Sequence, residues 1–465
     1  MLKTAGCVLC FLSFLLEPCF AQTLNATHES IARKLLEQGL TQPESYTMLS
    51  ELCVNAPHRL SGYEDAQRAV QLTKKMMTDR GFVNVHLEKI MVPRWVRGKE
   101  EAYIVPAPSL KQKQSMRVQK LSVCALGGSI ATPESGIDAE VVEVKTLDEA
   151  RALGSRGKGK IVFFNRAFDP TKLNAFAAYG GAVDQRSRGA IVAAQVGAVA
   201  VLVRSMTGRP DDVPHTGAMN YVDTVKKIPA AAVSIEGAEL LSASLARGQA
   251  RVRLTLTCKT LPDVESANVV GEIAGSEKPN EIIVVGGHLD CWDKGQGAHD
   301  DGAGCMQAIE VVNLIKKIGI RPKRTIRAVM FMNEENGNRG GRGYPVAAER
   351  KGEKHVAALE SDRGGFTPRG FTVAGDSSVQ KKVLEWKPYF DLLDASRIEP
   401  GYGGVDIAPL LDTGVPGFGL YVDSHRYFDY HHSDNDTIDK VNPRELELGA
   451  IVEAMICYLI SEEGL

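Results

Sequence analysis

Five side chains of the types that bind metal ions occur in the second half of the chain, in the order His288, Asp300, Glu335, Asp362 and His432. Each lies at the end of an apolar, strand-like run or in the loop that follows one. A set that mixes carboxylate oxygens with imidazole nitrogens suits zinc, and one carboxylate can bridge two ions. The pattern therefore predicts two zinc ions per chain and the chemistry of a hydrolase.

A pair of zinc ions requires three or more ligands for each ion, together with an open position for water. We assign His288, Asp300 and Asp362 to one ion. The other ion then takes Asp300, Glu335 and His432, so that Asp300 is the bridge. A shared carboxylate holds the ions about 3.5–4 Å apart, and the pair stabilises both the attacking and the developing oxygens.

Two more carboxylates have roles that follow from their positions. Glu334 precedes the ligand Glu335 but, by strand or turn geometry, points elsewhere, so it is free to act as the general base. Asp290 lies two residues after His288 and is expected to bond to that imidazole, which would fix its tautomer and raise its basicity. We therefore add Glu334 and Asp290 to the predicted catalytic residues.

Four segments that carry these residues resemble the co-catalytic zinc exopeptidases, a family that contains bacterial aminopeptidases and glutamate carboxypeptidases. They are HLDCWDKGQGAHDDGAG, NEENGNRGG, LESDRGG and YHHSDNDT. The resemblance runs from about Ser45 to the C-terminus, and it implies the same ligands, the same base and the same supporting aspartate. It also implies a cis peptide bond between Asp300 and Asp301. Release of a C-terminal amino acid from dipeptides or short unblocked peptides, by a homodimer, is implied as well.

The chain departs from many relatives at two places. Many have a tyrosine immediately before the last metal-binding histidine, where it assists the oxyanion, whereas this chain has His431. His431 is therefore a candidate oxyanion or substrate residue. Arg339 and Arg342, after the base, would suit a substrate carboxylate, although arginines at a helix start are more often surface residues. His299, before the bridge, is expected either to line the site or to pack against its neighbours.

Strand-like and helical patterns alternate after Pro262, which predicts an α/β domain with a mainly parallel mixed sheet sandwiched by helices, as in zinc exopeptidases. Ligands of such sheets lie beyond the carboxyl ends of the strands, where His288, Glu335 and Asp362 fall. The stretch 121–256 is rich in Val, Ala and Gly, with short strands, and is expected to be an inserted β-rich domain. The resemblance identifies it as similar to a protease-associated domain.

The N-terminus indicates a compartment. Lys3, an apolar run that ends at Leu16, and Ala21 are typical of a cleaved secretory signal peptide, since so short a run cannot span a bilayer. The expected divisions are a signal peptide at 1–21, a propeptide (as in a zymogen) or flexible leader at 22–44, the first part of the catalytic domain at 45–115, the protease-associated domain at 116–260, and the second part of the catalytic domain, with the metal ligands, at 261–465.

The amino-acid composition limits the classes of molecule that the protein is expected to bind. The hydrophobic share of 44% and the charged share of 24% are ordinary for a soluble globular protein, and a net charge of −2 offers no basic surface for nucleic acid. We expect no membrane span and a location in the secretory pathway: secreted, lysosomal, or in the ER or Golgi. Asn25 begins a glycosylation sequon, whereas the sequon at Asn435 lies in the proposed metal loop and is treated as chance. The six cysteines after the signal show no disulfide framework.

The sequence favours a two-zinc carboxypeptidase or dipeptidase, but three alternatives stay open. An aminopeptidase of the same family would recognise the other end of the peptide. A single-zinc transferase similar to glutaminyl cyclases would bind fewer ions, against which the complete ligand set argues. A catalytically silent receptor or binding module would have lost a ligand or the glutamate base, and neither is lost here.

Overall fold

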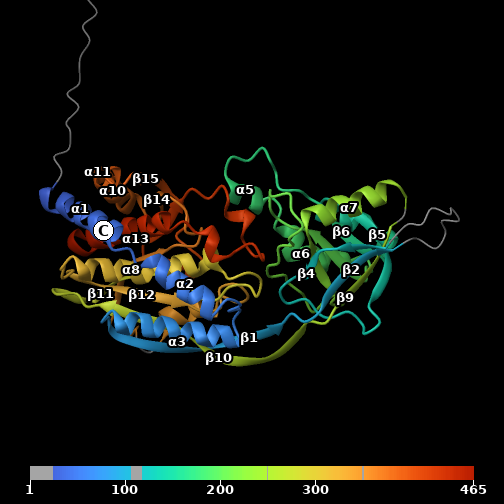
Figure 1. Ribbon diagram of the computed structural model, residues 1–465, viewed down its shortest axis with the longest axis horizontal. Helices are drawn as coiled ribbons and strands as arrows, with labels where there is room; N and C mark the ends of the chain where they lie inside the picture. Colours follow the sequence, from blue (N-terminus) through green and yellow to red (C-terminus); the bar gives the residue numbers. More distant parts are fainter. Residues whose placement is uncertain (1–24, 106–117, 249, 348–349) are drawn as a thin grey trace, which may run out of the picture.

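Two eight-stranded sheets divide the protein into two domains that lie side by side (Figure 1). The computed structural model describes residues 25–105, 118–248, 250–347 and 350–465, so the expected signal peptide lies outside the described residues. The two ends of the chain form the larger domain, and its middle forms the inserted domain. No helix in the described ranges is long and apolar enough to cross a membrane.

The sheet of the larger domain is parallel at its centre. Strands β12, β11, β13 and β16 run parallel to their neighbours in that group, whereas β1, β10 and β14 introduce antiparallel pairs at the sides. In sheet order the strands are β1 (Val83–Val96), β10 (Lys259–Ile273), β12 (Arg324–Phe331), β11 (Lys278–His288), β13 (Lys354–Glu360), β16 (Gly417–Val422), β14 (Pro368–Ala374) and β15 (Arg397–Pro400). The expected mixed α/β fold is confirmed.

Helices cover both faces of this sheet, which explains why its central strands are continuous apolar runs. One face packs against α1 (Ala26–Thr41), α2 (Ser45–Asn55), α3 (Glu64–Asp79), α8 (Ala303–Lys317) and α13 (Pro443–Glu463). The other face packs a smaller apolar cluster beneath α9 (Arg339–Gly343) and α12 (Ala408–Leu411). Short helices α10 (Ser377–Glu385) and α11 (Lys387–Asp391) follow β14. Every residue from Ala303 to Ile315 in α8 is buried.

The segment expected as a propeptide or flexible leader contains a well-formed helix. Asn25 caps α1 by accepting a hydrogen bond from Thr27 N, and Ile31, Ala32 and Leu35 are buried in the main core. The His28 imidazole lies 2.9 Å from Glu463 at the end of α13. Helix α1 is thus packed on the larger domain.

The inserted domain is not purely β-rich, because helices alternate with its strands. In sheet order the strands are β3 (Gln119–Leu121), β2 (Glu100–Val105), β9 (Arg251–Leu256), β5 (Ile137–Val144), β6 (Ile161–Phe164), β7 (Ala200–Arg204), β8 (Ala230–Val233) and β4 (Val123–Ala125). Its helices are α4 (Leu147–Ala152), α5 (Ala175–Gly180), α6 (Asp184–Gln195) and α7 (Ile235–Ala246). Because β2 pairs with β9, the first domain boundary lies between Val96 and Glu100 and not near residue 115. The likeness to a protease-associated domain stays a prediction.

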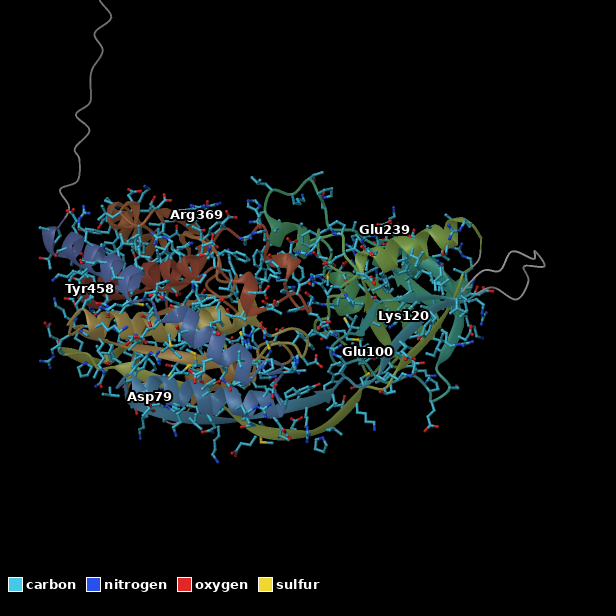
Figure 2. All side chains as sticks on the ribbon, viewed as in Figure 1. Asp79, Glu100, Lys120, Glu239, Arg369 and Tyr458 are labelled. Carbon is cyan, nitrogen blue, oxygen red and sulfur yellow. The ribbon has the colours of Figure 1, made fainter. Side chains whose placement is uncertain are left out.

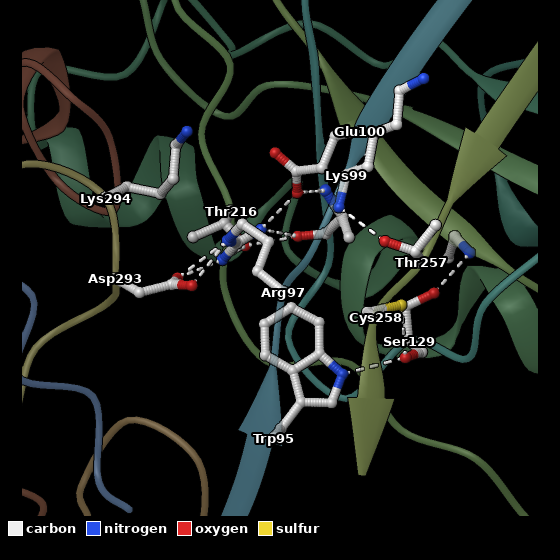
Figure 3. A network of polar contacts seen from close by, with 12 residues as sticks. Trp95, Arg97, Lys99, Glu100, Ser129, Thr216, Thr257, Cys258, Asp293 and Lys294 are labelled. Atoms are coloured by element: carbon white, nitrogen blue, oxygen red, sulfur yellow. Dashed lines mark hydrogen bonds and ion pairs between the residues drawn. The ribbon is translucent and has the colours of Figure 1, made fainter. Parts of the chain in front are cut away.

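Arg97 joins the two domains where the chain passes from β1 to β2 (Figure 3). Its Nε donates to both carboxylate oxygens of Asp293, at 2.9 and 2.8 Å, in the loop after β11. Its Nη1 donates to Glu100, at 2.9 Å, and to the Ala125 carbonyl, at 2.6 Å, in the inserted domain. Figure 2 places Glu100 on the side of the inserted domain that faces the larger one. A guanidinium held by charged and carbonyl acceptors fixes the junction.

Helix α9 is short. It ends at Gly343 and a 3₁₀ turn (Tyr344–Val346) follows it, because proline at position 345 and glycines disfavour a long helix. Cys53, Cys124, Cys258, Cys291, Cys305 and Cys457 are all unpaired and buried, in keeping with the absence of a disulfide framework.

Glu453 provides a test of the packing around α13. Among the described residues neither of its carboxylate oxygens has a hydrogen-bond partner, and burial raises its pKa to about 8. The protonated form is therefore favoured in the folded protein, so its contribution to stability is complete below about pH 4.5 and is lost as the pH rises through 8. Near pH 4.5 the free energy of unfolding of Glu453→Gln is expected to match that of the parent. At pH 8 the variant is expected to be more stable, because the parent loses up to about 1.4 kcal/mol for each pH unit between 4.5 and 8.

Urea unfolding of both proteins at several pH values measures this difference. Glu445→Gln, at a half-exposed position on the same helix, is the control. An advantage of Glu453→Gln that does not change with pH would contradict the prediction.

Candidate metal centre

Three parallel strands deliver three of the predicted ligands to one edge of the sheet. His288 is the last residue of β11, Glu335 follows β12, and Asp362 follows β13. These strands are neighbours in the order β12-β11-β13, so their carboxyl ends meet. Asp300 lies in the turn that precedes α8, and His432 lies in the loop between β16 and α13. The fold therefore brings all five residues together.

The carboxylate of Asp300 lies between two imidazoles. Its Oδ1 is 3.2 Å from His288 Nε2, and its Oδ2 is 3.3 Å from His432 Nε2. On one side, His288 Nε2 is also 3.6 Å from Asp362 Oδ1. On the other, His432 Nε2 is 3.0 Å from Glu335 Oε2. Two groups of ligand atoms thus share Asp300, as a bridged pair of cations requires.

The side chains of this site suit metal ions, because their buried carboxylates lack other partners that would neutralise the negative charge. Asp300 Oδ2 and Glu335 Oε1 are buried, and no group in the described part of the chain donates a hydrogen bond to them. Burial, and then the charge of Asp300, raise the pKa of Glu335 well above its ordinary value. Carboxylates held this close together need cations to stay ionised. Imidazole nitrogens among them favour zinc over magnesium or calcium.

His288 is held by the residue that was expected to hold it, but through a different atom. Its Nδ1 lies 2.9 Å from the main-chain carbonyl of Asp290, not from the Asp290 carboxylate. That carboxylate instead accepts hydrogen bonds from the main-chain N–H groups of Asn333, at 2.7 Å, and Glu334, at 3.0 Å. Asp290 therefore fixes the tautomer of His288 and the turn that carries the candidate base, since Nδ1 donates to the carbonyl.

Two aspartates that the sequence pattern did not single out position the bridge. Asp436 accepts hydrogen bonds from the N–H groups of His299, at 2.8 Å, and Asp300, at 3.1 Å. Asp301 accepts from the N–H of His288, at 3.0 Å. The peptide bond between Asp300 and Asp301 is cis, as the family resemblance implied. Asp436 is part of the YHHSDNDT segment, so its place near the ligand His432 was the available signal.

Two consecutive histidines face the centre because His432 has a left-handed backbone, with a φ of 60°. The two rings are stacked, with centroids 3.5 Å apart. His431 Nε2 lies 3.8 Å from Asp300 Oδ2, farther than the corresponding His432 atom. The His431 ring also packs against Tyr179, Tyr427 and Phe428. His431 is thus 7% exposed and enclosed by aromatic rings, which leaves it little freedom to follow a substrate.

The inserted domain reaches the same histidines. Thr216 N donates to the main-chain carbonyl of His432, at 2.9 Å. His215 Nδ1 lies 2.7 Å from the His431 carbonyl. The Arg186 guanidinium lies 3.4 Å from His432 Nδ1. No local motif marked His215, Thr216 or Arg186, because their relation to the two histidines exists only in the fold.

The role of Glu334 as general base stays a prediction. Its side chain is half-buried beside the ligands, and its carboxylate makes no hydrogen bond or ion pair with any described residue. Burial raises its pKa to about 8, aided by Asp362, Asp290 and Asp300. A carboxylate without other partners is available for proton transfer, and the positive charge of bound metal ions would favour its ionised form.

Three other candidates lie away from this chemistry. Arg339 donates to the Met91 carbonyl and pairs with Asp263 on the surface, and Arg342 is exposed. The His299 ring is stacked against Phe366 and also against Tyr430, which indicates packing. Asn25 is exposed, and the Asn435 amide donates to Asp211.

Comparisons with known proteins agree with this geometry. The sequence pattern of peptidase family M28 matches residues 268–456. The chain is 37% identical to carboxypeptidase Q of Rattus norvegicus over 441 residues, which cover 94% of this chain and 90% of that protein. It is 36% identical to carboxypeptidase Q of Homo sapiens over 425 residues, which cover 91% and 86%.

Solved structures give the same result. A peptidase M28 precursor from Shewanella amazonensis has a TM-score of 0.89 and 33% identity, over 94% of this chain and 98% of that one. A zinc aminopeptidase from Bacillus subtilis shares the fold, with a TM-score of 0.64 and 20% identity over 89% of this chain and 94% of that one. These similarities cover nearly the whole chain, and the geometry of the ligands agrees with them. The protein therefore belongs to peptidase family M28, a family of metallopeptidases.

Proposed function

We propose that the protein is a two-zinc exopeptidase that hydrolyses dipeptides or short peptides and releases the C-terminal amino acid. The observation that carries the proposal is the carboxylate of Asp300, which lies 3.2 Å from His288 and 3.3 Å from His432 with a further carboxylate on each side. Zinc dependence and peptide hydrolysis accord with the family, and carboxypeptidase action accords with the similarity to carboxypeptidase Q.

The residues divide the work between binding and proton transfer. His288, Asp300 and Asp362 would hold one zinc ion, and Asp300, Glu335 and His432 the other. Such a pair of ions, when bound, polarises the scissile carbonyl and makes water acidic enough to attack near neutral pH. Glu334 takes the proton of the attacking water and delivers it to the leaving nitrogen. Asp290 holds the main chain of Glu334 in place.

The alternative functions differ in which residues of the site they would leave without a role. A single-zinc transferase would need only one of the two proposed ligand groups, whereas the side chains of both lie around Asp300 here. A silent binding module would not require a free carboxylate at Glu334. The aminopeptidase alternative has less support, since the carboxypeptidases Q are 35–36% identical to the chain over most of its length, whereas the zinc aminopeptidase of Bacillus subtilis is 20% identical.

Partners and location follow from sequence and similarity. We propose a homodimer that enters the secretory pathway through its N-terminal signal and is secreted or lysosomal. Asn25, exposed at the start of α1, is the proposed glycosylation site. Helix α1 lies at the far end of the larger domain from the inserted domain (Figure 1), so removal of a propeptide there would not uncover the metal centre.

A panel of dipeptides tests the substrate class. Each peptide is offered free, acetylated at its N-terminus, and amidated at its C-terminus, and amino-acid release is measured. The free peptides are expected to be cleaved and the amides to be poor substrates, because a carboxypeptidase recognises the terminal carboxylate. Cleavage of amino-acid anilides, abolished by acetylation, would establish an aminopeptidase. No cleavage of any peptide by the zinc-loaded protein would favour the binding module.

Glu334→Gln tests the base. The amide keeps the size of the side chain but cannot accept the proton, so turnover is expected to fall by about 10²–10⁴-fold while the zinc content stays that of the parent. Steady-state kinetics and elemental analysis measure both quantities, with Glu64→Gln, at an exposed position with 94% side-chain exposure, as the control. Near-normal turnover of Glu334→Gln would exclude the assigned role.

Gly217→Ala tests whether the inserted domain supports the zinc site. Gly217 has a φ of +130°, and a Cβ there would overlap the Arg186 guanidinium and lie 2.7 Å from His432 Nδ1. Displacement of His432 is expected to lower the affinity for one of the two zinc ions by about 10–100-fold, as measured by competition with a chelator. Gly159→Ala is the matched control, since Gly159 also has a positive φ, of +72°, but nothing within 4 Å of its Cβ position. Equal zinc affinities for the two variants would contradict the prediction.

A further inference from the structure

A tyrosine of the inserted domain lies against the metal centre. Tyr179 is the residue before the last of α5, and its ring is stacked on Phe428, with centroids 4.7 Å apart and planes at 20°. The same ring meets His431 edge-on, at 5.2 Å. Since His431 Nε2 is 3.8 Å from Asp300 Oδ2, these contacts fix the tyrosine beside the bridging carboxylate.

Arg186 polarises this tyrosine and leaves its proton free. Arg186 Nη2 donates to the Tyr179 hydroxyl oxygen, at 2.7 Å. A guanidinium cannot accept a hydrogen bond, so the hydroxyl hydrogen must point elsewhere. In the described part of the chain no group accepts it. A positive charge bonded to the oxygen strengthens the hydroxyl as a donor, because hydrogen bonds polarise one another in a dry site.

His431 lies between Tyr179 and the bridging carboxylate: its ring is 5.2 Å from the Tyr179 ring, and its Nε2 is 3.8 Å from Asp300 Oδ2. Burial raises the pKa of Tyr179, whereas the Arg186 guanidinium lowers it and the charges of Asp300 and Glu335 raise it. Arg186 itself is 7% exposed, and its Nη1 lies 3.4 Å from both the Thr216 carbonyl and His432 Nδ1. The arginine is therefore held in place by the same segment that holds His432.

We propose that Tyr179 stabilises the oxyanion of peptide hydrolysis, with Arg186 as its positioning residue; this rests on the proposed function. Water oxygen forms a bond to the carbonyl carbon, and the π pair of the carbonyl moves onto its oxygen. The Tyr179 hydroxyl donates a hydrogen bond to that oxygen without giving up its proton. When the pair returns, the C–N bond breaks and the leaving nitrogen takes the proton that Glu334 accepted from water.

Tyr427 is the natural rival, because it lies in the same aromatic cluster and also near the ligand charges. It comes from the larger domain and is 3% exposed, and no cation is bonded to its hydroxyl in the described residues. Tyr179 is half-buried and carries the Arg186 contact. The residue before the last ligand is His431, which has no hydroxyl.

Tyr179→Phe tests the proposal, because it removes only the hydroxyl and keeps the ring packing. On an unblocked dipeptide we expect kcat to fall by about 10²–10³-fold, with KM changed by less than about threefold and zinc content unchanged. A phosphinic pseudodipeptide, whose P–O⁻ groups imitate the oxyanion, should lose affinity by a similar factor, whereas inhibition by the product amino acid should not change. Arg186→Lys should give a smaller loss of the same kind.

Tyr221→Phe is the matched control, since Tyr221 is a tyrosine of the inserted domain whose hydroxyl bonds to the main chain at Ile130 and Ile228, away from the metal centre. It should retain kcat within about twofold. Normal kcat and phosphinate affinity in Tyr179→Phe, or their loss in Tyr427→Phe alone, would overturn the proposal while leaving the exopeptidase function intact. If the parent protein cleaves no unblocked peptide, the proposed function fails, and this inference fails with it.

Discussion

The structure depends on one carboxylate that must serve two imidazoles. Asp300 turns one oxygen toward His288 and the other toward His432, and its Oδ2 has no hydrogen-bond donor among the described residues. So much buried negative charge is tolerable only if cations neutralise it. The parallel strands that end at this point, the turn before α8 and the loop after β16 are all arranged to bring their ligands to that carboxylate. Peptide hydrolysis is the chemistry that a bridged pair of zinc ions at such a place would support.

The inserted domain is part of this arrangement and not an appendage to it. Arg97 ties the loop after β11 to Glu100 and Ala125, and its Nη2 lies 3.4 Å from Thr216 Oγ1. Thr216 in turn bonds to the main chain of His432. A continuous series of polar contacts thus runs from the segment after one ligand, through the inserted domain, to another ligand. The two domains are therefore expected to bind metal as one unit.

Sequence patterns predicted the residues that follow recognisable strands, but they missed contacts between segments that lie far apart in the chain. The ligands follow strands whose apolar runs are visible in the sequence, so their meeting at one sheet edge could be predicted. The boundary near residue 115 was misplaced because β2 pairs with β9, which is far along the chain. Thr216, Arg186 and Tyr179 carry no motif of their own, and only the packing of the inserted domain reveals their relation to the histidines. Asp290 was predicted, but it holds His288 by its carbonyl, which no side-chain pattern can show.

X-ray diffraction recorded above and below the zinc absorption edge would test the shared carboxylate most directly. In crystals of protein purified without chelators, the account predicts two anomalous peaks of similar height, about 3.5–4 Å apart, with Asp300 between them. One peak should lie beside His288 and Asp362, and the other beside Glu335 and His432. A single peak, or an Asp300 side chain that bonds to neither ion, would contradict the account.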